Sequence, residues 1–237
     1  MKKLIVDDAI FKLFPETKIG VIVVRHLTNK MDSRVTTSFL SETASSIQNK
    51  YSGKTLAEID EIKRWREAYK KFNANKKYRS SIESLYARTL KGKPLPTINP
   101  LVDFYNAISL KYAMPCGGED LHRIKGNIRL TFANGDEPFY EIGSDTMQYP
   151  VQHEIIYKDD AGCICRNWNW READRTKITE QTNSAILVIE SISSHKHAHL
   201  NDAIERLSDL LKHHMDAQIE VAVLDLFKRE LQLDASD

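Results

Sequence analysis

The sequence predicts an α+β protein in which helices come first and antiparallel strands follow. Apolar residues recur at helical spacing over residues 55–72, 80–90 and 101–112. From residue 127 onward, the apolar residues instead alternate along short segments that end at turn signals. Helices and strands are therefore grouped and do not alternate as in βαβ units, which is the pattern of the α+β class.

A buried strand is expected at residues 20–24, where apolar residues run continuously. The stripe of helix 55–72 consists of Leu56, Ile59, Ile62, Trp65, Tyr69 and Phe72. Helix 80–90 ends at a glycine that two prolines follow. Helix 101–112 opens after Asn99-Pro100, because proline is favoured in the first helical turn.

The second half of the chain carries most of the expected strands. They lie at residues 127–132, 139–142, 154–157, 163–168, 185–190 and 219–224, with a helix at 200–215 between the last two. Asn134-Gly135-Asp136 is one of the turn signals that separate them. We expect the strands from residue 127 to 190 to form one sheet system, with helices 55–72 and 101–112 packed on it.

The composition is that of a soluble globular protein, with 41% hydrophobic and 28% charged residues among 237. No apolar run approaches the roughly 18 residues that span a membrane. The chain begins like a signal peptide, but Asp7 and Asp8 interrupt the hydrophobic region before it starts. We therefore expect a cytoplasmic protein without membrane contact.

Cys116, Cys163 and Cys165 are an odd number of cysteines without a regular pairing. The Cys-x-Cys pair has only one further cysteine with which to complete a zinc site. Reduced thiols in a reducing compartment are therefore expected, with no metal site and no cofactor.

The net charge of +1 does not indicate a binding partner. A partner must therefore be inferred from how the charges are distributed along the chain. Residues 63–79 hold eight cations against a single acid, Glu67, and aromatic residues are interleaved with them. Cations bind phosphates and aromatic rings stack on unpaired bases, which favours an RNA surface. Its expected members are Arg66, Lys70, Lys71, Lys76, Lys77, Arg79 and Arg88. The alternative is a solvated helix whose aromatic stripe is simply core.

Two runs carry a resemblance to a known family. Residues 77–83 read Lys-Tyr-Arg-Ser-Ser-Ile-Glu, and residues 98–106 read Ile-Asn-Pro-Leu-Val-Asp-Phe-Tyr-Asn. Further matching segments are 115–120, 126–130, 135–137, Thr182 and 185–190. Together they resemble the B3/4 domain of the phenylalanyl-tRNA synthetase β-subunit. The run Arg-Asn-Trp-Asn-Trp-Arg at 166–171 is similar to a signature of freestanding family members.

This resemblance covers about residues 65–191 and implies a fold. It implies a partly closed, mainly antiparallel, barrel- or sandwich-like sheet with flanking helices and a pocket between sheet and helices. We expect one such domain over residues 1–237, with an extension at 1–60 and a helix–strand segment at 200–225 packed on it.

The resemblance also implies a function. In the synthetase this domain hydrolyses wrongly charged tRNA, whereas the synthetase's own active-site domain has no counterpart here. A tRNA-binding aminoacyl-tRNA deacylase is therefore expected, which acts on the aminoacylated acceptor end in quality control of translation.

The site residues come from the same resemblance. Glu190 and Asn106 match the family's editing glutamate and pocket asparagine, and are the expected catalytic residues. The expected substrate-binding residues are Pro115, Cys116, Gly117, Gly118, Asn167, Trp168, Asn169, Trp170 and Arg171. Ester hydrolysis needs a positioned water and a recognised amino group, and Glu190 can orient either of them.

The signature run leaves two interpretations open. On an extended segment, Trp168 and Trp170 would face one way and the alternating polar residues the other. Arg166 and Arg171 would then grip a terminal phosphate or the ester carbonyl. Alternatively, both tryptophans are core and the arginines pair with Glu172 or Asp174.

The sequence departs from the synthetase in two places. Gly117 stands where the bacterial enzyme has a pocket histidine, and bulky residues replace the glycines of its specificity loop. These departures favour a second hypothesis, a module that binds tRNA or an amino acid without chemistry. A third is a metal-dependent hydrolase built on His195, His197 and His199, which would share one face of a strand. Cys116 has no partner base nearby in sequence and is expected to line the pocket only.

Overall fold

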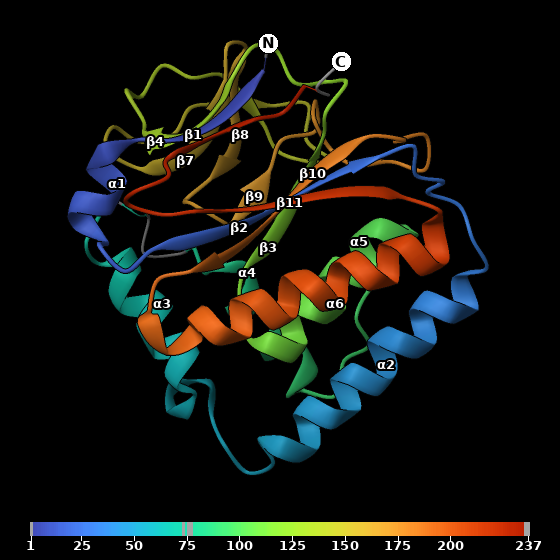
Figure 1. The fold of residues 1–237 in the computed structure, drawn as a ribbon. Helices are drawn as coiled ribbons and strands as arrows, with labels where there is room; N and C mark the ends of the chain where they lie inside the picture. The colour runs from blue at the N-terminus through green and yellow to red at the C-terminus, as the bar shows by residue number, and fades with distance from the viewer. Residues whose placement is uncertain (1, 73, 75–77, 235–237) are drawn as a thin grey trace.

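Two β-sheets lie face to face in the computed structural model, which describes residues 2–72, 74 and 78–234 (Figure 1). The six-stranded sheet has the order β12 (Glu230–Gln232), β1 (Lys3–Val6), β4 (Ile128–Phe132), β7 (Ile155–Asp159), β8 (Gly162–Arg166), β9 (Arg171–Glu172). The four-stranded sheet has the order β11 (Gln218–Leu224), β2 (Lys18–Arg25), β10 (Ala185–Ser191), β3 (Cys116–Asp120). A separate hairpin joins β5 (Phe139–Tyr140) to β6 (Met147–Gln148).

The apolar pattern of β10 explains the layers. Its continuous apolar run is buried on both faces, which is typical of a strand covered on two sides. Ile186 and Val188 face the core shared with the six-stranded sheet, whereas Leu187 and Ile189 pack against helices. Glu190 follows the period of two and points to the same side as Ile186.

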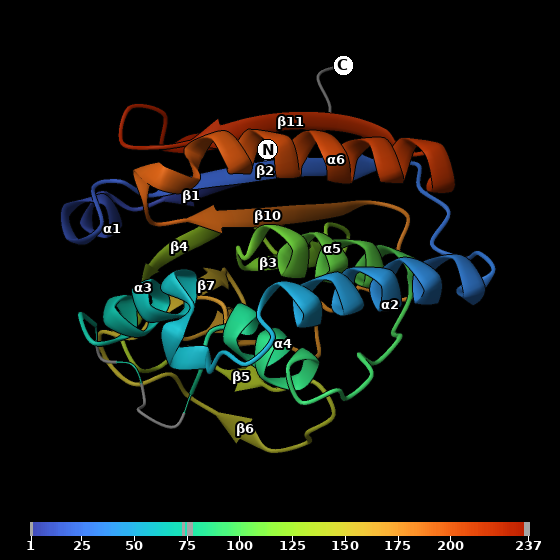
Figure 2. The same cartoon turned by 90° about the horizontal axis from the view of Figure 1, so that it is seen from below.

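Helices cover the opposite face of the four-stranded sheet. This layer contains α5 (Pro100–Tyr112) and α6 (His197–Met215), and α2 (Ser33–Lys50) packs on the outside of α5 (Figure 2). Asn99 caps α5 by accepting a hydrogen bond from the Val102 amide, with Pro100 in the first turn.

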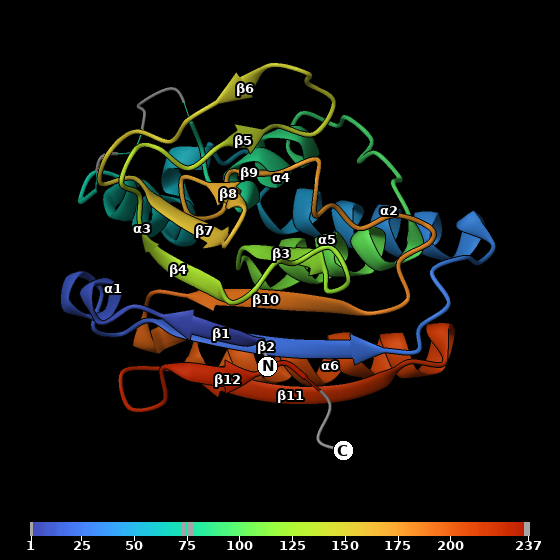
Figure 3. The same ribbon diagram turned by 90° about the horizontal axis from the view of Figure 1, so that it is seen from above.

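The remaining helices lie at the end of the sheets that also carries the β5–β6 hairpin (Figure 3). They are α3 (Asp60–Tyr69) and α4 (Ser81–Thr89), with the 3₁₀ turn η1 (Leu56–Glu58) before α3. The short helix α1 (Asp8–Leu13) follows β1, and the 3₁₀ turn η2 (Ser194–Lys196) leads into α6.

The predicted α+β class is confirmed, and so are the helices expected at 80–90, 101–112 and 200–215. Helix 55–72 is shorter than expected, because Ile59 is extended (φ −90°, ψ 117°) and separates η1 from α3. The partly closed barrel is not confirmed: the described strands form open sheets whose edges include β9 and β3.

The expectation of one sheet system over residues 127–190 is wrong. β10 pairs with β2 and β3, whereas β4, β7 and β8 belong to the other sheet. The first sixty residues contribute to both sheets, since β1 pairs in parallel with β4 and β2 pairs antiparallel with β10. None of the described helices is long and apolar enough to cross a membrane.

Candidate active site

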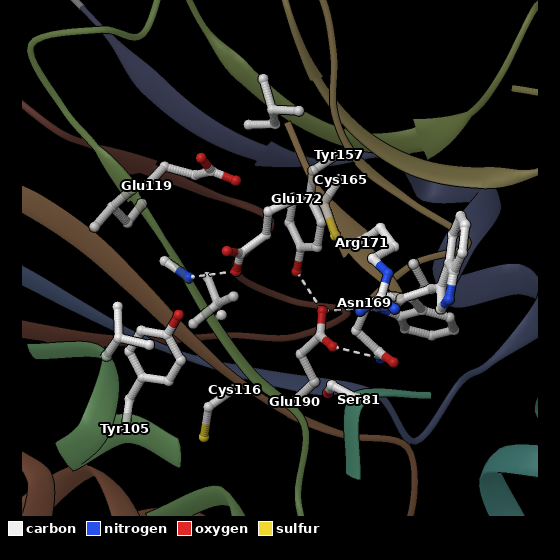
Figure 4. Close-up of a pocket in the computed structure, with 18 of the residues that line it drawn as sticks. Ser81, Tyr105, Cys116, Glu119, Tyr157, Cys165, Asn169, Arg171, Glu172 and Glu190 are labelled. Carbon is white, nitrogen blue, oxygen red and sulfur yellow. Dashed lines mark hydrogen bonds between the residues drawn. The ribbon is translucent and has the colours of Figure 1, made fainter. Parts of the chain in front are cut away.

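A pocket of about 450 Å³ lies between the two sheets, where the edge strands β3 and β9 approach each other. One wall comes from β3 and β10, the other from β7, β8 and β9, and α5 closes one end. The walls combine aliphatic side chains with four carboxylates. Glu141 pairs with Arg171, and the other three are those of Glu119, Glu172 and Glu190 (Figure 4).

Glu190 is 1% exposed and accepts three hydrogen bonds. Its Oε1 receives one from Tyr157 Oη at 2.6 Å and one from Trp168 Nε1 at 2.8 Å. Its Oε2 receives one from Asn169 Nδ2 at 2.7 Å (Figure 4). Burial raises the pKa of Glu190 to about 7, although all three donors act to lower it. The carboxylate is therefore fixed in place and changes charge near neutral pH.

A tight turn between β8 and β9 presents two of these donors. Asn167 and Trp168 have left-handed backbones, with φ of 46° and 65°. Asparagine tolerates this conformation, whereas a tryptophan in it is strained and must be held by its surroundings. Trp168 is fully buried and its ring packs edge-on against Phe14 and Trp65, at centroid distances of 5.0 and 5.2 Å.

Two further contacts fix Asn169. The hydroxyl of Tyr69 in α3 donates to the Asn167 carbonyl at 2.6 Å and lies 3.2 Å from Asn169 Oδ1. The Ser81 amide of α4 donates to the Asn169 carbonyl at 3.1 Å. The turn at residues 167–169 is therefore held in place by α3 and α4, two helices from the first half of the chain.

The turn corrects several expectations. The segment is not extended, so Trp168 and Trp170 do not share a face, and Asn167 is buried outside the pocket. Arg166 is 4% exposed and makes a bidentate pair with buried Glu154, at 3.0 and 2.8 Å. It is not free to hold a phosphate. Neither expected acid is the partner of an arginine here, because Arg171 pairs with Glu141 at 3.0 Å.

The other expected residues of the pocket lie where α5 and β3 meet. Asn106 of α5 lines the pocket, together with Cys116, Gly117 and Gly118. Pro115 lies outside the lining, and its carbonyl accepts the Glu190 amide at 2.9 Å. Burial raises the pKa of Cys116 far above the usual range of a thiol, which is unfavourable for a nucleophile.

The sequence analysis missed Glu119 and Glu172. Glu172 Oε1 accepts the Gly118 amide at 3.3 Å, and a Cβ at Gly117 would lie 3.1 Å from the same oxygen. The carboxylate of Glu172 therefore occupies the space that a side chain at residue 117 would enter. One signal in the sequence pointed to this space, because Gly117 stands where the bacterial synthetase has a pocket histidine. Glu172, whose carboxylate fills the space, is distant in sequence and could not be identified from it.

The mouth of the pocket carries a stack of aromatic and cationic groups. Tyr78 and Trp170 are stacked with centroids 3.5 Å apart, and Arg171 lies over the Trp170 ring at 5.4 Å. Arg166 lies over the Tyr78 ring on the other end, at 5.8 Å. Arg171 is exposed, so the outer end of the stack faces solvent.

The family model of the B3/4 domain matches residues 64–225 of this chain. The chain belongs to the B3/4 domain family. The match begins where the resemblance in sequence begins and extends beyond residue 191, through α6 and β11.

Solved structures with a similar fold include an N-terminal fragment of the phenylalanyl-tRNA synthetase β-subunit from Pyrococcus horikoshii. The identity is 11% and the TM-score 0.48, over 91% of this chain and 49% of that one. This B3/4 protein thus spans about half the length of that fragment. No curated protein matches its sequence significantly.

The basic residues expected to bind tRNA are partly neutralised within the B3/4 protein. Arg66 and Arg79 both approach buried Glu83, at 2.8 and 3.6 Å, and Lys70 pairs with Glu67 at 2.6 Å. Lys71 is exposed and lies over the Phe14 ring.

Of the other expected members, Arg88 donates to the Pro94 carbonyl at 2.6 Å. Lys76 and Lys77 lie outside the described residues. Of the expected members that the structure describes, Lys71 is exposed, and Lys70 is exposed although it pairs with Glu67. Exposed ion pairs contribute little, so both lysines remain accessible to an anion.

The histidine run is not on a strand. His195 lies in η2 and His197 begins α6, where alternate residues point to different sides of the helix. His197 Nε2 lies 2.9 Å from the Glu16 carbonyl. Within residues 2–72, 74 and 78–234, no group of three or more histidine, cysteine or acidic side chains can hold a metal ion. The cysteines of this part of the chain are free thiols.

Proposed function

We propose that this B3/4 protein hydrolyses the ester of mischarged aminoacyl-tRNA in trans, as a step of translation quality control in the cytoplasm. The observation that carries the proposal is Glu190, a buried carboxylate fixed by three donors in the wall of the pocket between the two sheets. Its pKa of about 7 lets it act as a base or as an anion near neutral pH.

The proposed hydrolysis depends on which carboxylate oxygen of Glu190 can accept a further hydrogen bond. Oε1 already accepts from two groups, whereas Oε2 accepts from one and has capacity for another donor. In the proposed reaction, this oxygen orients a water molecule that adds to the ester carbonyl carbon. The bond to the terminal ribose oxygen then breaks, and the products are the free amino acid and tRNA with a restored hydroxyl.

Asn106 lies in the same pocket and can donate its side-chain amide to the ester carbonyl or accept from the α-ammonium. An aminoacyl ester is already activated, so positioning and electrostatic stabilisation are sufficient and no nucleophilic side chain is required. The raised pKa of Cys116 agrees with such a mechanism.

The acceptor end would enter past the stack at the mouth. Arg171 and Trp170 offer a cation and a ring to the terminal nucleotide, and Lys70 and Lys71 offer cations to more distant phosphates. We propose that residues 1–237 work as one unit in this, since β1 and β2 complete the sheets that hold the pocket.

One observation favours a second candidate, a module that binds an aminoacylated tRNA or a free amino acid without chemistry. Three protein donors already satisfy Glu190, which is also how a purely structural carboxylate is held.

A deacylation panel separates these functions. The purified protein is offered tRNAs that each carry a different wrong amino acid, and the ester remaining is followed with time. Hydrolysis that Glu190→Gln abolishes supports the deacylase. If the parent protein binds the aminoacylated tRNAs but accelerates hydrolysis of none, the deacylase proposal is wrong and the binding module stands.

A further inference from the structure

Glu119 and Glu172 form an acidic subsite in the pocket that the proposed reaction does not use. Glu119 comes from β3 and Glu172 from β9, so the two carboxylates approach from different sheets (Figure 4). Glu119 is 7% exposed, and within the described part of the chain its Oε2 has no hydrogen-bond partner of normal geometry. The buried Thr176 hydroxyl lies near enough to lower the pKa of Glu119, but it does not reach this oxygen at hydrogen-bond geometry. A buried carboxylate oxygen without a donor is costly unless a ligand satisfies it.

The charges around the pair leave it short of a cation. The charge of Arg175 acts to lower the pKa of Glu119. The two terminal nitrogens of Arg175, however, are already hydrogen-bonded to Asp159, at 3.0 and 2.7 Å. Burial and then the charge of Glu172 raise the pKa of Glu119 well above its ordinary value. Burial raises the pKa of Glu172 to about 7. Burial and mutual repulsion therefore oppose a double negative charge on the pair.

Tyr105 and Cys165 lie near the pair, since burial and then the charges of Glu172 and Glu119 raise the pKa of both groups. Much of the remaining pocket lining is aliphatic. Leu4, Ile128, Ile164 and Ile186 line the pocket from both sheets. An unbranched aliphatic chain ending in an ammonium group matches such a surface, because its methylenes pack on the wall while its charge reaches the carboxylates.

We propose that Glu119 and Glu172 recognise a cationic amino-acid side chain, so that the substrate is an aminoacyl ester whose side chain ends in an amine, such as lysine or ornithine. This inference rests on the proposed function, in which Glu190 and Asn106 hold the reacting end of the same ligand. The cationic side chain donates to the unpartnered oxygen of Glu119 and offsets the repulsion between the two carboxylates.

The test uses a ligand that cannot be hydrolysed. Adenosine carrying a lysyl group through an amide at its 3′ position is compared with the norleucyl analogue, which has the same carbon chain without the amine. Isothermal titration calorimetry with the whole protein should give at least about tenfold tighter binding of the lysyl compound. Titrations in buffers of different ionisation enthalpy should show proton release with the lysyl compound alone.

Glu119→Gln and Glu172→Gln should each reduce the preference for the lysyl compound over the norleucyl compound. The affinity of each variant for the norleucyl compound should be unchanged, and this retained binding shows that the variant is folded. Glu205→Gln, on the exposed face of α6, is the matched control and should keep the full preference. Equal affinities, binding of neither compound, or a preference that survives both variants would each overturn the proposal.

The two proposals fail in different ways. Deacylation of tRNAs with neutral amino acids, together with equal lysyl and norleucyl affinity, would leave the deacylase standing and overturn the cationic subsite. A lysyl preference in a protein that deacylates no tRNA would support the subsite and overturn the deacylase.

Discussion

The indole nitrogen of Trp168 donates a hydrogen bond of 2.8 Å to Glu190, and this contact joins the six-stranded sheet to the four-stranded one. Trp168 is in a strained left-handed backbone conformation and Glu190 is a buried carboxylate with a raised pKa. The strained backbone of Trp168 and the buried carboxylate of Glu190 would each be unfavourable alone. Packing of the ring and three donors to the carboxylate hold them together, so the position of Glu190 depends on the turn.

Glu190→Gln should lower the deacylation rate about tenfold or more, which corresponds to about 1.4 kcal/mol in the barrier. An amide nitrogen cannot accept from the donors at this site, and a neutral group does not activate water. The affinity for tRNA should change little, because phosphate contacts set it. Single-turnover deacylation and filter binding measure the two quantities, and a variant that deacylates as fast as the parent contradicts the role of Glu190.

Tyr157→Phe should move the pH–rate profile to higher pH. The Tyr157 hydroxyl lowers the pKa of Glu190, so its removal raises that pKa above about 7. If the ionised form is active, the rate rises as pH rises through the pKa, and the variant should lose more activity near about pH 6 than near about pH 9. Tyr149→Phe, at an exposed tyrosine, should keep the parent profile. An unshifted profile in Tyr157→Phe would show that another group controls the rate.

Glu172→Gln should make the stability of the protein less dependent on pH. Between the ordinary carboxyl pKa of 4.5 and the folded value of about 7, the folded protein keeps a proton that the unfolded chain has released. The free energy of unfolding of the parent therefore falls as pH rises through this window, by up to about 1.4 kcal/mol per pH unit for each such group. Urea unfolding across the window should give a shallower slope for Glu172→Gln, and identical slopes would contradict the raised pKa.

Replacing Lys70 and Lys71 by glutamate should weaken tRNA binding and reduce its dependence on salt. Each phosphate contact contributes about 0.9 to the slope of log affinity against log salt for duplex nucleic acid. Binding is measured from about 50 to about 200 mM salt, with Lys228→Glu on the β11–β12 loop as the control. An affinity equal to that of the parent would move the RNA surface elsewhere.

Glu154→Gln should destabilise the protein by about 3–5 kcal/mol, because it leaves Arg166 buried without its partner. The parent pair is bidentate, and Glu154 is fully buried. Glu141→Gln removes the partner of Arg171, which is 53% exposed at its side chain, and should change stability by less than about 1 kcal/mol. Chemical denaturation measures both, and equal effects would contradict the assignment of Arg166 to the core.

Local pattern was enough to predict much of the fold. Helical periodicity and the Asn99-Pro100 cap located α5, and alternation with turn signals located β4, β7 and β8. These features depend on neighbouring residues alone. The sheet in which each strand lies depends on pairing between segments far apart in the chain. β2, expected as a buried strand, pairs with β10, whereas β1, which no pattern predicted, pairs with β4, and two sheets were found where one was expected.

The sequence by itself determined that Glu190, Asn106 and the turn around Trp168 were the residues to examine, through a family resemblance that the family match confirms. Only the tertiary structure decided which charges are free. Arg166 forms an ion pair with Glu154, and Arg66 forms one with Glu83. The carboxylate of Glu172 fills the space beside Gly117. Ion pairing and steric exclusion act through space between residues far apart in the chain, so no spacing in the sequence encodes them.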